Sequence, residues 1–132
     1  MAPEGLITTT SAHDPATTLE RLTATIVAKG MAVLARIDHA GAAAKVGLTL
    51  RPTEVVIFGN PRAGTGLMQA AQTMGIDLPL KALVWQDEAG KTQLSYNDPK
   101  WLAERHGIGA EADKTLAAMS DALAALAKEA TS

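Results

Sequence analysis

The stretch TEVVIFGNPRAGTGLMQAAQTMG, residues 53–75, decides the fold of this chain. It begins with a continuous apolar run, which is typical of a buried strand. Asn60 and Pro61 follow as a helix N-cap and a proline suited to the first helical turn. Apolar residues then recur at helical spacing up to Gly75. The stretch therefore predicts a strand, a turn containing glycine and a helix.

The residues before this stretch continue the same mixture of strands and helices. GLITTTS, residues 5–11, is rich in β-branched residues, and MAVLARID, residues 31–38, alternates, so both predict strands. The alternation places four residues on one face of the second strand: Met31, Val33, Ala35 and Ile37. Asp14-Pro15 begins a helix that stops at Gly30, and residues 39–47 form a short alanine-rich helix.

The residues after it predict a hairpin and two helices. LKALVWQ, residues 80–86, and KTQLSYN, residues 91–97, flank a glycine-containing turn. A third cap-proline pair, Asp98-Pro99, begins another helix, and residues 110–130 form an amphipathic one. This order predicts an α+β fold, with a largely antiparallel sheet of about five strands and helices packed on it. The length of 132 residues is that of a single domain, residues 1–132.

Composition excludes several classes of function. The chain has no cysteine, which rules out disulfides, zinc–thiolate sites and cysteine nucleophiles. Its net charge is −2, with no basic block, so we expect no nucleic-acid partner. The first ten residues lack the features of a signal peptide, and no apolar run approaches the roughly 20 residues of a membrane span. We expect a cytoplasmic protein without cofactors or a membrane partner.

The turn GNPRAGTG, residues 59–66, resembles a phosphate-binding loop only in part. Gly59 and Gly64 have the P-loop separation, but the P-loop lysine is missing. Arg62 places a cation in a first helical turn, where it opposes the helix dipole. Either a carboxylate such as Glu54 pairs with it, or an anion binds there. The latter hypothesis predicts a site for a carboxylate, sulfate or monophosphate rather than ATP–magnesium. Its residues are Arg51, Asn60, Arg62, Ala63, Gly64 and Thr65.

Other chemistry-bearing residues form no recognisable motif. His13, His39 and His106 lack metal-ligand spacing, so we expect no metal site. No serine lies in G-x-S-x-G. An acid–base enzyme could use only Asp38, His39 and Tyr96, provided that their strands lie close together.

Three segments of the chain resemble one known bacterial family. They are LRPTEVVIFGNPRAGTGLMQAAQTMGIDLPLKALVW (residues 50–85), LSYNDPKWLAERHG (94–107) and ARIDHAGAAAKVGL (35–48). They resemble the domain of unknown function 302, with a likeness running over about residues 5–107. The resemblance implies a compact α+β domain of the TATA-binding-protein-like group, often homodimeric, with no established activity. Gly66 departs from the family pattern, which has proline after Gly64-Thr65.

These observations favour a non-enzymatic homodimeric module that binds a small, anionic or amphipathic ligand. The acid–base enzyme and a purely structural or assembly protein remain alternatives. A stripe on the last helix, Leu116 to Leu126, offers a second reason to expect a homodimer. The same stripe could instead close the domain's own core. Trp85 and Trp101 are expected to be structural rather than to stack on a ligand.

Overall fold

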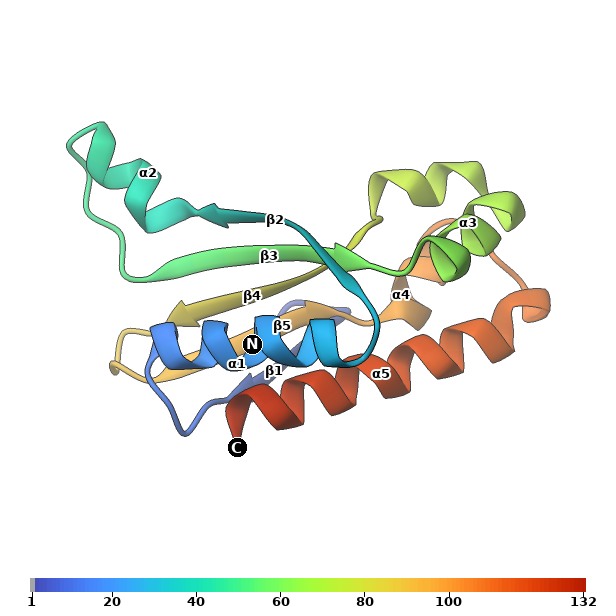
Figure 1. Ribbon diagram of the computed structural model, residues 1–132. Coiled ribbons are helices and arrows are strands. Elements are labelled where there is room, and N and C mark those ends of the chain that lie inside the picture. Colours follow the sequence, from blue (N-terminus) through green and yellow to red (C-terminus); the bar gives the residue numbers. More distant parts are fainter. Residues whose placement is uncertain (1) are drawn as a thin grey trace.

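The computed structural model describes residues 2–132, which form one sheet covered by helices (Figure 1). The sheet has five strands in the order β1-β5-β4-β3-β2, and every neighbouring pair is antiparallel. The α+β prediction is therefore confirmed. The strands are Leu6–Thr10 (β1), Ala32–Asp38 (β2), Thr53–Gly59 (β3), Leu80–Gln86 (β4) and Thr92–Asn97 (β5).

The helices begin where the sequence places its capping residues. The side chains of Asp14, Asn60 and Asp98 each accept a hydrogen bond from a backbone N–H in the first turn of the following helix. Each cap is followed by a proline, which has no N–H to leave unpaired. The helices are Pro15–Ala28 (α1), His39–Lys45 (α2), Pro61–Ala70 (α3), Pro99–Arg105 (α4) and Asp113–Thr131 (α5), with 3₁₀ turns at Gln72–Ile76 (η1) and Ala110–Ala112 (η2).

The core lies between one face of the sheet and the helices α1 and α5, which pack against each other across it (Figure 1). Val56 and Phe58 of β3 are fully buried on this face, as is Ile26 of α1. The stripe of α5, from Leu116 to Leu126, is buried here as well. The stripe therefore closes the domain's own core and is not available to a second copy of the chain.

In residues 2–132 the opposite face of the sheet carries no helix along its centre, and we call it the open face. In the register of the strands, Ile37 of β2 pairs with Val55 of β3, and Val55 pairs with Leu83 of β4. These residues point away from α1 and α5, because their strand neighbours Val56 and Val84 point into the core. Ile37 is 43% exposed.

The alternation predicted for residues 31–38 is wrong in one respect. Val33 pairs with Phe58 and Ala35 pairs with Ile57, so that Leu34 is an extra residue in a β-bulge. A bulge shifts the pleat by one residue, and the side chains on either side of it face opposite ways. Val33 therefore lies on the helix face, whereas Ala35 and Ile37 lie on the open face.

The helix predicted after Asn60 is also shorter than expected. It ends at Ala70, where Ala71 takes the extended conformation (φ −151°), and the chain continues as the 3₁₀ turn η1. The break re-aims the following turn, and Met74 becomes fully buried. The sequence predicted Met74 as part of the apolar face of the helix. Met74 is instead buried in the core as a residue of η1.

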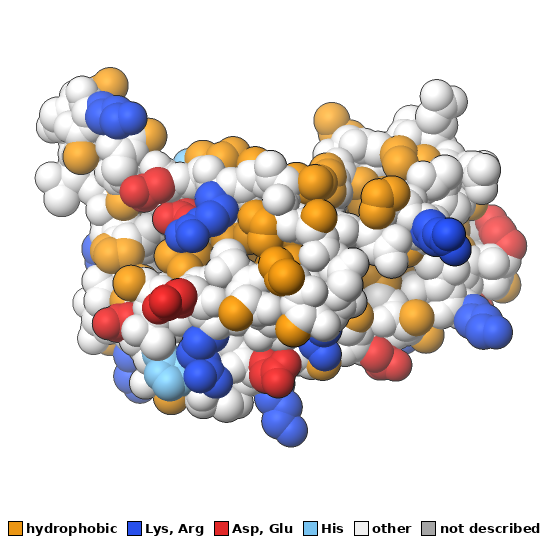
Figure 2. Space-filling view, in the orientation of Figure 1, with side chains coloured by type: hydrophobic (Ala, Val, Ile, Leu, Met, Phe, Trp, Pro, Cys, Tyr) orange, Lys and Arg blue, Asp and Glu red, His pale blue; other side chains and the backbone are white. Residues whose placement is uncertain are grey.

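The second helix projects from the end of β2 and β3 and buries none of its own residues (Figure 1). We call residues 39–50 the arm. Three large apolar side chains on it are exposed: Val46, Leu48 and Leu50. Figure 2 shows hydrophobic side chains gathered along the upper edge of the molecule, between the arm and the region of α3. Within residues 2–132 no helix has the length and apolar character needed to cross a bilayer.

Candidate functional site

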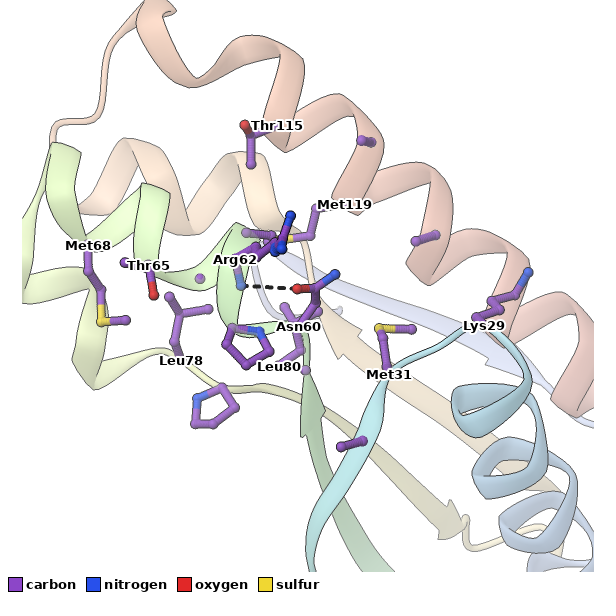
Figure 3. Close-up of a pocket in the computed structure, with 18 of the residues that line it drawn as sticks. Lys29, Met31, Asn60, Arg62, Thr65, Met68, Leu78, Leu80, Thr115 and Met119 are labelled. Atoms are coloured by element: carbon purple, nitrogen blue, oxygen red, sulfur yellow. Dashed lines mark hydrogen bonds between the residues drawn. The ribbon is translucent and has the colours of Figure 1, made fainter.

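A hollow lies where α3 begins, beside α5 and the first residues of β2 and β4. Its volume is about 880 Å³, within the range of small-molecule pockets. Figure 3 shows the labelled side chains around this cavity, with Asn60 and Arg62 lying between the start of α3 and α5. Elements far apart in the sequence meet here, because β3 delivers α3 to the end of the sheet that α5 crosses.

Most of the cavity wall is apolar. Met31 comes from the start of β2, Leu78 and Leu80 from the approach to β4, and Met68 and Met119 from α3 and α5. Methionine side chains are flexible and adapt to irregular apolar ligands. This wall is therefore suited to a hydrocarbon chain or ring.

Three cations line the same cavity: Lys29 after α1, Arg62 in α3 and Lys114 in α5. None of the three forms an ion pair with another described residue, and no carboxylate belongs to the lining. The Asn60 side chain caps α3, accepting a hydrogen bond from the Arg62 N–H at 3.0 Å. The Thr65 and Thr115 side chains supply hydroxyl groups to the wall. The cavity thus combines an apolar wall with uncompensated positive charge.

The structure shows which cation forms an ion pair with Glu54. Its Oε2 lies 2.5 Å from Nε of Arg36, a residue of the neighbouring strand β2. Glu54 therefore does not neutralise Arg62, which removes the competing explanation for a cation in the first turn of α3. The free-energy cost of that cation against the helix dipole, about 0.3–1 kcal/mol when exposed, stays uncompensated within the described chain.

Five of the six residues predicted for the anion site line this cavity: Asn60, Arg62, Ala63, Gly64 and Thr65. Arg51 does not. It lies before the opposite end of β3, where its Nε donates to the backbone carbonyl of Gln86 at 3.2 Å. A strand rises about 3.3 Å per residue, which places Arg51 roughly 25–30 Å from Asn60. Arg51 and Asn60 both lie next to β3 in the sequence, but they lie at opposite ends of that strand.

The residues considered for an acid–base enzyme are not brought together. Asp38 caps α2, accepting from the Gly41 N–H at 2.9 Å, and His39 is exposed on the arm. Tyr96 lies on β5, three strands away from β2, and its side chain is part of the core. Burial raises the pKa of its phenol, and the nearby carboxylate of Asp98 raises it further. A tyrosine with a raised pKa inside the core does not serve as a base beside His39.

One histidine does meet a carboxylate, in a cluster that sequence reasoning missed. His106 Nε2 lies 2.5 Å from Oδ2 of Asp77, and His106 Nδ1 lies 2.9 Å from Oγ1 of Thr73. Arg105 Nη1 also donates to Asp77, at 2.9 Å. The order hydroxyl, imidazole, carboxylate is that of a proton relay, but none of these residues lines the cavity at the start of α3. The cluster ties η1 to the end of α4.

Sequence reasoning also missed the far wall of the cavity. Lys29 and Lys114 belong to no motif in the sequence, and Met119 lies within the stripe of α5. Nothing in their local sequence signals a site, because Lys29 follows α1, Lys114 and Met119 lie on α5, and these elements meet α3 only in the folded chain. The long separation of α3 from α5 along the chain explains the omission.

A model of one protein family matches this chain over residues 7–126. Its description is "domain of unknown function DUF302". The match runs into α5, further along the chain than the resemblance noted in the sequence. A crystal structure of an uncharacterised conserved DUF302 protein from Bacillus stearothermophilus superposes with a TM-score of 0.86, covering 97% of this chain and 99% of that one. The two sequences are 21% identical, so this likeness shows the fold alone.

Curated relatives of this chain carry a functional name. The fluoride-specific ion channels FluC 1 of Brucella suis biovar 1 (strain 1330) and of Brucella abortus biovar 1 (strain 9-941) are each 50% identical to this chain over 115 residues. The match covers 87% of this chain but only 45% and 43% of those proteins. The chain therefore spans less than half the length of the curated relatives it matches.

Proposed function

Because the chain belongs to the DUF302 family, whose description assigns no activity, we propose a function from its own site: a non-enzymatic module that binds a small amphipathic anion. The ligand occupies the cavity between α3, α5 and the starts of β2 and β4. The observation that carries the proposal is the charge of this cavity. Three cations and no carboxylate border a wall that is mostly apolar.

The geometry supports a ligand with a charged head and an apolar tail. An apolar compound alone would leave Lys29, Arg62 and Lys114 without a counter-charge. A small inorganic anion alone would leave the methionine and leucine wall in contact with water. A carboxylate, sulfate or monophosphate attached to a hydrocarbon tail satisfies both parts. The head lies near Arg62 at the start of α3, where the positive end of the helix dipole favours an anion.

Calorimetric titration with straight-chain carboxylates tests the proposal. Burying one methylene contributes about 0.8 kcal/mol, which corresponds to roughly fourfold in affinity. Affinity should therefore rise from acetate through hexanoate to decanoate, each used below its critical micelle concentration. A decyltrimethylammonium ion, which has a tail of the same length and the opposite charge, should not bind. Equal affinity for both charges, or no dependence on chain length, would contradict the proposal.

Two arginine variants form a matched pair for this test. Arg62→Ala removes a cation that lines the cavity, and Arg51→Ala removes one at the far end of β3. Loss of one solvent-accessible charged partner should weaken decanoate binding roughly three- to tenfold in Arg62→Ala. Arg51→Ala should bind as the unmodified protein does. If both variants lose affinity equally, the effect comes from net charge rather than from the cavity.

The same titrations, followed through the backbone amide signals of residues 59–66, examine the loop itself. Shifts with sulfate or phosphate that vanish in Arg62→Ala would support a head-group site at the start of α3. Because the P-loop lysine is absent, ATP–magnesium should bind no more tightly than these simple anions. Tight ATP–magnesium binding would show that the loop acts as a nucleotide site after all.

A second candidate function rests on the names of the Brucella relatives. We propose as an alternative that the module serves fluoride handling, because its matching segment is half identical to proteins named fluoride-specific ion channels. Sodium fluoride and sodium chloride, compared at equal ionic strength, distinguish the two candidates. Amide shifts specific to fluoride would favour the alternative. Equal responses to both salts, together with binding of decanoate, would favour the amphipathic anion.

A further inference from the structure

We infer that the charged head of the ligand is a dianionic phosphate monoester rather than a carboxylate or a sulfate ester. The inference rests on the proposed function, because it concerns the same cavity, and it narrows three acceptable head groups to one. Two observations carry it. Cations stand at the starts of two helices that border the cavity, and the described wall contains neither a histidine nor a carboxylate.

Arg62 and Lys114 hold equivalent positions in their helices. Arg62 is the second residue of α3, and Lys114 is the second residue of α5. A cation in a first helical turn opposes the helix dipole, so helix geometry alone disfavours both residues. Both nevertheless line one cavity. An anion bound there is attracted by two cations and by the positive ends of two helix dipoles at once.

Packing brings the start of α5 to α3. Helix α3 contacts the 3₁₀ turn η2, and α5 begins at the residue that follows η2. The first residue of α5, Asp113, lines a separate hollow together with Lys100 and does not belong to the wall of this cavity. Of these first two residues of α5, it is therefore Lys114 that borders the ligand.

The remaining polar residues of the wall suit a head with several acceptor oxygens. Lys29, the C-cap residue of α1, adds a third positive charge, and Thr65 and Thr115 add hydroxyl donors. A phosphate monoester has three strong acceptor oxygens and a charge of about −1.5 to −2 at pH 7. A carboxylate has two oxygens, and both a carboxylate and a sulfate ester carry a single negative charge. The phosphate therefore gains most from three cations.

The charge of the wall stays constant over the pH range in which a phosphate monoester titrates. The charged residues come from the end of α1 and from α3 and α5, whereas the strands contribute only uncharged residues to the described wall. Lysine and arginine side chains remain charged near neutral pH. The second proton of a phosphate monoester leaves near pH 6, at about the middle of this range. A change of affinity between pH 5 and pH 7.5 therefore originates in the ligand.

Octyl phosphate and octyl sulfate form a matched pair of ligands, because they share a tail and a tetrahedral head and differ in charge. Both are titrated calorimetrically into the full chain, below their critical micelle concentrations. At pH 7.5 octyl phosphate should bind roughly tenfold more tightly, because its second negative charge meets three solvent-accessible cations. At pH 5, where the phosphate is mostly a monoanion, the ratio should fall to about twofold. The affinity for octyl sulfate should not change with pH.

Two lysine variants of the same helix provide the matched control. Lys114 lines the cavity, whereas Lys128 is exposed near the end of α5 and is not part of the wall. Lys114→Gln should lower the phosphate-to-sulfate ratio at pH 7.5 roughly twofold. Lys128→Gln should leave the ratio unchanged. The ratio is insensitive to a general loss of stability, since both ligands are measured on the same variant.

Vesicles distinguish the two sources from which such a phosphate could come. Phosphatidylcholine vesicles are prepared with and without phosphatidate and sedimented with the protein. Cosedimentation that requires phosphatidate, together with binding of octyl phosphate, would support the inference with a bilayer lipid as the ligand. Binding of octyl phosphate without cosedimentation would support it with a dissolved ligand.

The inference and the proposed function fail in different ways. Equal affinity for the two octyl compounds at pH 7.5, or a ratio that does not fall at pH 5, would overturn the inference; the proposed function would stand if decanoate binds. A ratio that Lys128→Gln lowers as much as Lys114→Gln does would also overturn it, because net charge would then be the cause. If neither the octyl compounds nor decanoate bind, the inference and the proposed function are both wrong.

Discussion

Gly5 occupies a position that no other residue fits. Its φ is +76°, and a Cβ there would lie 2.3 Å from Cδ2 of Trp101, whose indole rests against the Gly5 backbone. Gly5→Ala should lower the free energy of unfolding by about 1–2 kcal/mol for the left-handed conformation and by about 1–3 kcal/mol more for the clash. Gly30→Ala is the control. Its φ is +80° with open space around it, so only the first cost applies. Urea denaturation of both variants measures the difference.

Asp87 organises the turn between β4 and β5. Its carboxylate accepts hydrogen bonds from the side chain of Gln93 and from the N–H groups of Lys91 and Ala89, which lower its pKa below the ordinary 3.8. The contribution to stability is therefore complete above about pH 4 and is lost as the pH falls through the folded-state pKa. Urea unfolding at several pH values should show Asp87→Asn with a shallower loss of stability in acid. If the free energy of unfolding falls equally with pH in both proteins, the turn does not stabilise the ionised carboxylate of Asp87.

At the scale of residues, the sequence predicts helix-capping residues better than ion-pair partners. Asp14, Asn60 and Asp98 cap helices as expected, because a cap depends on neighbours two or three positions away. The partner of Glu54 could not be read in this way. It lies on an adjacent strand, 18 positions away in the chain, and which arginine it meets depends on the register of β2 against β3.

At the scale of elements, the Thr73–His106–Asp77 cluster should govern how firmly η1 is held. These side chains join η1, and the residue that follows it, to the end of α4. His106→Ala should therefore speed amide hydrogen exchange in residues 72–77 without changing it in the sheet, because local openings are independent of global unfolding. His13→Ala is the control, since His13 bonds instead to the backbone carbonyl of Ser132. Equal exchange rates in both variants would show that the cluster does not hold η1 in place.

Every strand and every helix of seven or more residues was predictable, but two details of their geometry were not. The bulge at Leu34 and the break at Ala71 interrupt patterns that look regular in the sequence. Both are set by packing: Val33 joins the core cluster on the helix side, and the turn after Ala71 places Met74 inside it. Hydrophobic periodicity indicates which element forms, but not where an element must bend to fit its neighbours.

At the scale of the whole molecule, α5 should be required for folding. Leu123 is 3% exposed and lies between α5 and the rest of the core. Leu123→Ala should lower the free energy of unfolding by about 2–5 kcal/mol, from lost burial and the cavity it leaves. The control Val27→Ala removes a side chain that is 64% exposed and should cost less than about 1 kcal/mol. Thermal unfolding followed by circular dichroism compares the two.

The candidate site was predictable only on its α3 side. Asn60, Arg62 and Thr65 follow one another in a single turn, and a local motif is enough to single them out. Lys29, Lys114 and Met119 come from two other helices and their flanks. The open face could not be predicted either. The alternation of β2 indicates that the strand has two different faces, but it does not indicate which face the helices cover.

The position of β1 has a consequence for synthesis on the ribosome. Of the five strands β1 is made first, yet it pairs only with β5, which is made last of the five. At about 5–20 residues per second, β1 waits roughly 4–17 s for its partner. Its sequence, LITTT, is dominated by threonine, which keeps an unpaired nascent strand less adhesive than an aliphatic one would be. The nascent chain can assemble the meander β2–β5 one hairpin at a time, and β1 joins the sheet only after β5 has been made.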